Sequence, residues 1–179
     1  MTLIPQIRPY HPYDVEAVYQ AVVESKSKLM PWMPWCHEHY SRSDTVEWVT
    51  KRQEAWENNV DWSFAIVDAS GRILGGTGLH RLDLRNGVGE IGYWIRTSAT
   101  RQGVAVAAVG LVCEWAFRER GLRRIELMAA VENRPSRSVA VRAGFTQEGI
   151  LRERLLIRGQ PCDAVLFAKL LTTTTTDAG

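Results

Sequence analysis

The chain lacks the cysteine and hydrophobic patterns of disulfide-rich, metal-binding or membrane-spanning proteins. Its three cysteines, Cys36, Cys113 and Cys162, have no CxxC spacing. We expect them to be reduced, in a cytoplasmic setting, and Cys113 to pack in a core. No metal-ligand spacing is present, and no apolar stretch reaches the length of a membrane span. The first residues have no basic segment followed by an apolar run, so we expect no signal peptide.

A strong excess of one charge is also missing. The 22 basic and 20 acidic side chains leave a net charge of +2 over 179 residues, which is too mild for a nucleic-acid partner but suits a local anionic ligand such as a phosphate. With 45% hydrophobic residues the chain is long enough to bury a core. We expect one domain over residues 1–171 and a disordered polar tail over 172–179.

The hydrophobic periodicity predicts elements in the order βααβββαβαββ. Helices are expected over 13–29, from a capping box at Asp44 and Glu47 to about 58, over 104–120, and from Pro135 to 143. Strands are expected over 3–8, 62–67, 73–84, 90–95, 124–131, 145–156 and 162–171. This order predicts an α/β layered fold, a mixed and mostly antiparallel sheet of about seven strands with helices on both faces.

Small residues lead into the most periodic helix, in the segment Thr100-Arg-Gln-Gly-Val-Ala105. The first N–H groups of a helix are unpaired and carry positive potential, so they can bind a phosphate or pyrophosphate. Gly103 and Ala105 would let such a ligand approach the backbone. The same composition is common in ordinary strand-to-helix turns, and the segment alone favours that simpler interpretation.

Polar side chains follow the strand over 124–131 and begin the strand over 90–95. Asn133 and Ser136 lie on the loop side of parallel strands, where α/β proteins bind ligands; either residue could instead cap the helix that follows. Glu90 shares a strand face with Trp94. It is either a functional carboxylate or a surface charge at the start of the strand.

Taken in order, these segments resemble the GNAT superfamily of N-acetyltransferases, and more closely its RimJ/RimL-type branch, which includes enzymes that acetylate the N-terminal amine of ribosomal proteins. The resemblance covers roughly residues 7–171. The motifs that carry it are Met30-Pro-Trp-Met-Pro-Trp35, Glu90-Ile-Gly-Tyr-Trp94, Thr100-Arg-Gln-Gly-Val-Ala105, Glu132-Asn-Arg-Pro-Ser136, Ala143-Gly-Phe145 and Glu148-Gly149.

The resemblance implies acetyl-CoA as the co-substrate, no metal, and transfer of the acetyl group to a primary amine. It implies that Asn133 contacts CoA, that Ser136 protonates the departing thiolate, and that Glu90 lies near the acceptor amine. The resemblance also implies that the CoA pyrophosphate is held by the amides of Arg101, Gln102, Gly103, Val104, Ala105 and Val106. The pantetheine arm would pair, as an added strand, with Trp94, Ile95 and Arg96.

The general base and the acceptor stay open at this point. Leu155 stands where RimL-like enzymes have a glutamate, and the role does not transfer to Glu153; Glu90 acting through water, or His80, could accept the proton. Trp32 and Trp35 either wall the acceptor pocket or pack in the core. The acceptor is expected to be a protein N-terminus, with a small-molecule amine (antibiotic, polyamine or amino-sugar) or a non-catalytic acyl-CoA-binding role as alternatives. Homodimer formation is left open.

Overall fold

The structure is a computed structural model that describes residues 4–172. It contains one mixed sheet of seven strands in the order β1-β2-β3-β4-β5-β7-β6, in which only the β4–β5 pair is parallel. The strands are β1 Gln6–Pro9, β2 Trp62–Val67, β3 Ile73–Asp83, β4 Val88–Ile95, β5 Arg124–Ala130, β6 Thr146–Ile157 and β7 Gln160–Leu170. The predicted fold class is confirmed.

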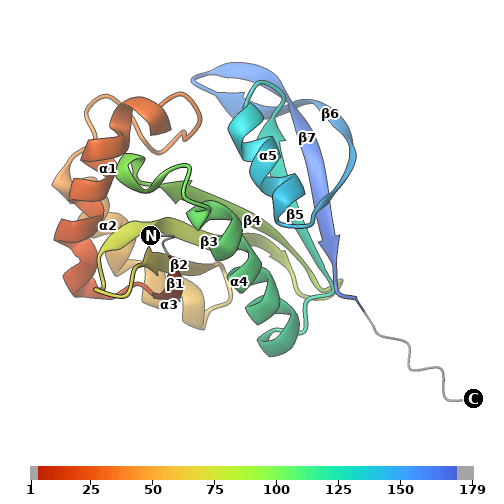
Figure 1. The fold of residues 1–179 in the computed structure, drawn as a ribbon, viewed down its shortest axis with the longest axis horizontal. Helices are drawn as coiled ribbons and strands as arrows, with labels where there is room; N and C mark the ends of the chain where they lie inside the picture. Colours follow the sequence, from red (N-terminus) through yellow and green to blue (C-terminus); the bar gives the residue numbers. More distant parts are fainter. Residues whose placement is uncertain (1–3, 173–179) are drawn as a thin grey trace, which may run out of the picture.

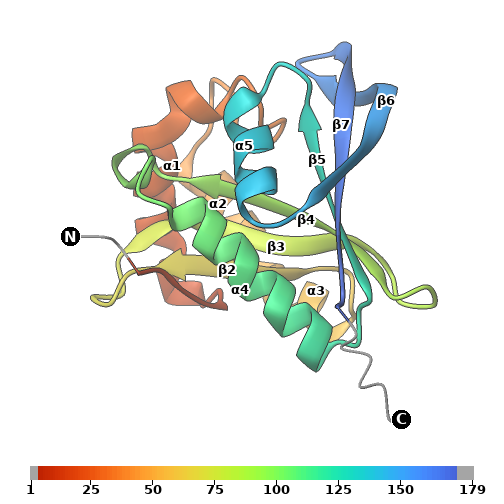
Figure 2. The same cartoon turned by 45° about the vertical axis from the view of Figure 1, so that its right-hand side comes forward.

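Helices cover both faces of this sheet. They are α1 Val15–Leu29, α2 Arg42–Thr50, α3 Arg52–Glu57, α4 Val104–Glu119 and α5 Arg134–Arg142, with short 3-10 turns at Pro12–Asp14 and Thr97–Ala99. Figures 1 and 2 show α4 and α5 together on one face, which we call the α4 face, and α1 with α2 on the other, the α1 face. Among the described residues, no helix combines the length and apolar character that a membrane crossing requires.

The helical periodicity of α4 accounts for its position. Val109, Val112 and Ala116 are fully buried at helical spacing and pack with Leu79 and Ile125 of the sheet. A second cluster on the α1 face joins Val18 and Val22 of α1 to Ala65, Val67 and Ile73. These two apolar layers hold the sheet between the helices.

The helix expected over 44–58 is wrong in its start and in its continuity. The capping box uses Ser41 and Asp44, because the backbone N–H of Ser41 donates to Asp44 Oδ2 (2.8 Å). The chain then divides into α2 and α3 at Lys51. The Thr50 hydroxyl donates to the carbonyls of Val46 and Glu47, a local bond of the kind that bends or interrupts helices.

Strands β4 and β5 separate soon after they meet. Only Val88–Glu90 pairs with Arg124–Glu126, whereas β4 stays paired with β3 as far as Ile95 and β5 stays paired with β7 as far as Ala130. The two halves of the sheet therefore diverge, as Figure 2 shows. The predicted tail over 172–179 lies, apart from Thr172, outside the described residues.

Candidate active site

A cavity of about 420 Å³ lies in the gap where β4 and β5 separate, and residues from both faces of the sheet line it. Its α4-face lining includes Tyr93, Asn133 and Ser136, and its α1-face lining includes residues of β3 and the loop before α2. All the residues predicted for catalysis or acceptor binding line this cavity. They are Glu90, Asn133, Ser136, His80, Trp32 and Trp35. The fold therefore brings together side chains from the α1–α2 loop, β3, β4 and the start of α5.

The start of α4 presents free backbone donors. Gly103 is the N-cap in a left-handed conformation (φ 79°), Arg101 is also left-handed (φ 61°), and no side chain caps the helix. The N–H of Ala107 bonds to the Gly103 carbonyl, so the earlier helical N–H groups precede the first helical bond. The first turn contains no acidic residue. Such an uncapped helix start is suited to a phosphate oxyanion.

Two side chains of the predicted phosphate loop are held by the protein, and a third is exposed. Val104 is buried in the core, and the Gln102 amide donates to the Ser98 carbonyl (2.9 Å). Arg101 is exposed. The capacity of this segment to bind an anion lies in its backbone, which Val104, Ala105 and Val106 supply.

The backbone of β4 has an unpaired edge along the gap. The N–H of Arg96 donates to the Leu74 carbonyl (2.8 Å). Because the hydrogen bonds of an antiparallel pair alternate, the backbone groups of Tyr93 and Ile95 point away from β3, towards the gap. An extended ligand can pair with this edge.

The three residues predicted on β4 for the pantetheine arm differ in their placement. Ile95 lies on the unpaired edge. The indole of Trp94 packs with the cluster of the α1 face. The Arg96 guanidinium forms an ion pair with Glu24 and donates to the Ile73 carbonyl (2.9 Å), so it is held by the protein.

Ser136 and Asn133 have separate tasks in the structure. Asn133 is the N-cap of α5, since its Oδ1 accepts from the N–H of Ser136 (3.1 Å). The hydroxyl of Tyr93 donates to Ser136 Oγ (3.0 Å). Ser136 Oγ therefore keeps its own proton available to donate. Burial raises the pKa of Tyr93 more than the bond to Ser136 lowers it, so the phenol stays protonated. Tyr93 was not among the residues predicted for the site, although it neighbours Trp94 in β4.

The carboxylate of Glu90 contacts His80 and Arg81 on the α1 face. Its Oε1 lies 3.2 Å from His80 Nε2, and Arg81 donates to its Oε2 (3.0 Å). A β-bulge puts Arg81 in a left-handed conformation (φ 49°), beside the carboxylate. Burial alone would raise the pKa of Glu90, but His80 and Arg81 outweigh it, and the pKa lies below its usual value. Glu90 is 12% exposed and ionised, which excludes the alternative of a surface charge.

His80 itself is open to the cavity. Its side chain is 43% exposed, and its ring lies over Gly92, where a Cβ would be 3.2 Å from His80 Cε1. A carboxylate that orients an imidazole is a common arrangement for a proton acceptor. The pair of His80 and Glu90 can therefore accept a proton on the α1 face of the gap.

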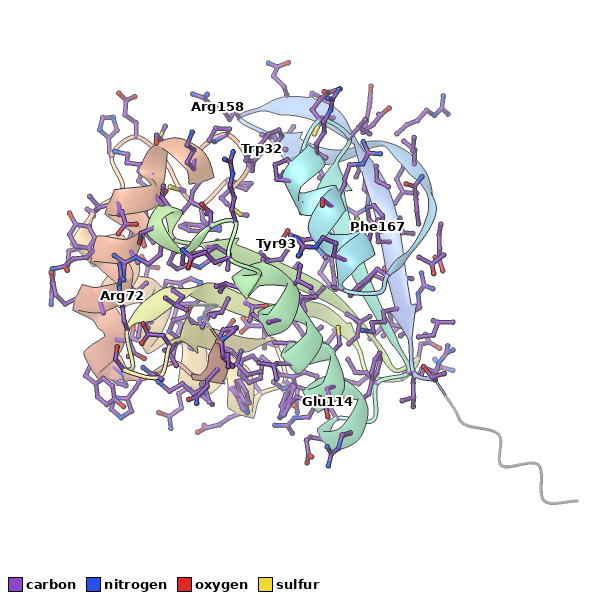
Figure 3. All side chains as sticks on the ribbon, viewed as in Figure 1. Trp32, Arg72, Tyr93, Glu114, Arg158 and Phe167 are labelled. Atoms are coloured by element: carbon purple, nitrogen blue, oxygen red, sulfur yellow. The ribbon has the colours of Figure 1, made fainter. Side chains whose placement is uncertain are left out.

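Aromatic side chains wall the remainder of the cavity. Trp35 is 40% exposed and makes an edge contact with Trp94 (centroids 6.0 Å apart). Trp32, on the α1–α2 loop, lines the cavity, and in the view of Figure 3 it lies next to Arg158 of the β6–β7 turn. Both tryptophans line the cavity rather than the core.

Strand β6 contributes Leu155 but not Glu153. Leu155 lines the cavity, whereas Glu153 belongs to a register shift between Leu151 and Leu155 and is left-handed (φ 49°). Its N–H donates to Asp163 Oδ1 (2.8 Å). The bulge turns Glu153 out of the strand face. No three His, Cys, Asp or Glu side chains of residues 4–172 gather in a way that could hold a metal ion.

This combination of a divergent mixed sheet, an uncapped helix start and a free strand edge is that of an N-acetyltransferase. The chain belongs to the GNAT family, since residues 6–146 match the acetyltransferase (GNAT) domain. It is 32% identical to YdaF of Bacillus subtilis, a provisionally named ribosomal N-acetyltransferase, over 92% of this chain and 90% of that protein. The predicted membership of the RimJ/RimL-type branch is confirmed, and GNAT enzymes take the acetyl group from acetyl-CoA.

Two further proteins are similar to this chain, one in sequence and one in fold. The ribosomal-protein-serine acetyltransferase of Escherichia coli is 26% identical over 88% of this chain and 87% of its own length. A structure of RimL, the ribosomal L7/L12 α-N-protein acetyltransferase, in complex with coenzyme A has the same fold, with a TM-score of 0.86 at 23% identity over 96% of both chains.

Proposed function

We propose that this chain transfers an acetyl group from acetyl-CoA to the N-terminal α-amine of a protein, with a ribosomal protein as the first candidate. The observation that carries the proposal is the gap between β4 and β5, which joins backbone donors on the α4 face to a polar, aromatic cavity on the α1 face. The names of the two relatives support this acceptor class. The cytoplasm is the compartment in which such an acceptor is expected.

The residues at the gap fit acetyl-CoA. The free N–H groups of Val104, Ala105 and Val106 would hold the pyrophosphate. The unpaired edge at Tyr93 and Ile95 would pair with the pantetheine arm. When bound, acetyl-CoA supplies a thioester, whose carbonyl carbon an amine can attack. A backbone N–H on the edge of β4 would stabilise negative charge on the carbonyl oxygen.

Two proton transfers are assigned to side chains of this protein. Ser136, which accepts a hydrogen bond from Tyr93, would donate its proton to the departing sulfur. On the other face His80, oriented by Glu90, would take the proton from the attacking amine. An α-amine has a pKa of about 8, so near neutral pH it needs only modest help to lose this proton. A lysine side chain, with a pKa of about 10.4, needs much more.

The decisive experiment offers several amines to the full chain with acetyl-CoA. One set of acceptors is tripeptide amides with a free N-terminus. A second set is lysine-containing tripeptide amides with a blocked N-terminus, and a third is a polyamine and an amino-sugar. Thiol release gives the rate, and mass spectrometry locates the acetyl group. We expect transfer to the free α-amine. Transfer confined to lysine or to the small molecules would contradict the proposal.

A further inference from the structure

One polar atom in the cavity has no role in the steps above. Tyr10 follows β1 and lines the cavity, and its hydroxyl is buried without a hydrogen-bond partner among the described residues. Its ring is fixed by an edge contact with Trp48 (centroids 4.7 Å apart). A buried hydroxyl without a partner destabilises a fold. Tyr10 therefore presents a hydroxyl that a bound molecule could satisfy.

The indole of Trp94 brings a second donor to the same place. A Cβ on Gly76 would lie 2.2 Å from the Tyr10 hydroxyl oxygen and 2.6 Å from Trp94 Nε1, so both atoms lie directly over this glycine. The neighbouring glycines differ, because a Cβ at Gly75 or Gly78 would first meet backbone oxygen. No side chain larger than hydrogen fits at Gly76 without displacing the two polar groups.

The charges around the cavity indicate what kind of group fits there. The charged side chains that line it are Arg52, Asp61 and Glu90. Arg52 is paired with Asp61 (2.5 Å), both being 16% exposed, and Glu90 is paired with His80 and Arg81. An anionic ligand would find no unpaired cation in this lining. An indole N–H only donates, so a ligand group that contacts this pair of side chains must be an acceptor. A neutral carbonyl oxygen meets both conditions.

We infer that the Tyr10 hydroxyl and the Trp94 indole N–H form a subsite for a main-chain carbonyl of the acceptor peptide. This inference rests on the proposed function and makes it more specific. The reacting amine would lie beside His80, at the level of Gly92, while the peptide extends along the α1 face towards Gly76. The subsite would distinguish a peptide N-terminus from an amine that has no carbonyl group.

The test compares Tyr10→Phe with Tyr13→Phe in the full chain, using a tripeptide amide with an N-terminal serine. Both changes remove one hydroxyl, but Tyr13 is 71% exposed and does not line the cavity. We expect Tyr10→Phe to raise the KM for the peptide about five- to tenfold, the effect of one lost hydrogen bond. Its kcat and acetyl-CoA affinity should stay within about twofold, and Tm should stay the same or rise. Trp94→Phe should also raise KM.

The outcomes separate this inference from the proposed function. An unchanged peptide KM in Tyr10→Phe, or a lower Tm, would overturn the subsite while the wild-type activity on peptides upholds the function. If the wild-type chain acetylates other amines but no peptide N-terminus, the proposed function fails and the subsite fails with it.

Discussion

The two faces of the sheet contribute to the site with different parts of the chain. On the α4 face the groups that would bind acetyl-CoA are mostly backbone: the start of α4 at Val104 and the edge of β4 at Ile95. On the α1 face the groups that would contact the acceptor are side chains, among them Tyr10, His80 and Trp35. A backbone site depends on local conformation, whereas a side-chain site depends on which distant residues the fold brings together. Substitutions should therefore act differently on the two faces.

The largest effect is expected at the junction of the faces, from Ser136→Ala. Losing the proton donor should lower kcat by about 10²-fold, the lower end for general acid catalysis. Acetyl-CoA affinity should hardly change, because the interaction strengthens only as charge develops on sulfur. Steady-state kinetics, calorimetry and Tm on one variant test this. Asn133→Ala is the control: it removes the helix cap and should cost about 1 kcal/mol of stability. A drop in kcat of less than about threefold for Ser136→Ala would contradict the role.

Gly103→Glu tests the backbone site. It places a negative charge at the start of α4, and about 2 kcal/mol lost there lowers acetyl-CoA affinity on the order of 30-fold. Gly71→Glu is a matched control, since Gly71 is also left-handed (φ 83° against 79°) and both have open space around a Cβ. Calorimetry should show the loss only for Gly103→Glu. Equal affinities in the two folded variants would remove the α4 start from the cofactor site.

On the α1 face, His80→Ala should lower kcat/KM about tenfold at pH 7. At that pH only about a tenth of an α-amine with a pKa near 8 is already neutral. The loss should shrink towards unity by pH 9, where the amine deprotonates without a base. His39, which is exposed and does not line the cavity, provides the control His39→Ala. A pH profile of both variants is the measurement, and a loss independent of pH would argue for a structural role of His80.

The smallest effect concerns Glu90 and stability. Its pKa is lowered in the fold, so the ionised carboxylate stabilises the protein fully above its usual pKa of about 4.5. This contribution is lost as the pH falls through the lower, folded pKa. Glu90→Gln should therefore lower Tm by a few degrees at pH 7 and by less at pH 3. The exposed pair of Glu47 and Lys51 gives the control Glu47→Gln, with little change at either pH. A Tm difference that is larger at pH 3 than at pH 7 would reverse the sign and contradict this.

The same contrast explains which parts of the site the sequence could predict. The α4 start depends on neighbouring residues, so Gly103 and Ala105 indicated it from the sequence. The contact of Tyr93 with Ser136 joins residues 43 positions apart, and the pair of Arg96 with Glu24 joins residues 72 apart. No local pattern contains such contacts. For this reason Tyr10 and Tyr93 were missed as site residues, and the ion pair of Arg96 with Glu24 was not predicted.

The fold was predicted more completely than the site, for a physical reason. Periodicities of 2 and 3.6 are repeated over whole elements, so the order of strands and helices tolerates local errors. Two local features that the pattern did not predict arose where a side chain bonds to the backbone. Thr50 ends α2, and Asp163 accepts from the N–H of Glu153 in the bulge of β6. Such side-chain bonds to the backbone leave little trace in a hydrophobic pattern.

The separation of β4 from β5 also bears on aggregation. An unpaired strand edge on a protein surface is a template to which another polypeptide can add. Here the edge at Tyr93 and Ile95 lies inside the sheet, between the β3 and β5 halves and beside α4 and α5. A second protein would have to insert a strand between two packed halves to reach it. The chain can thus keep an adhesive edge for a slender ligand without offering that edge to its own copies.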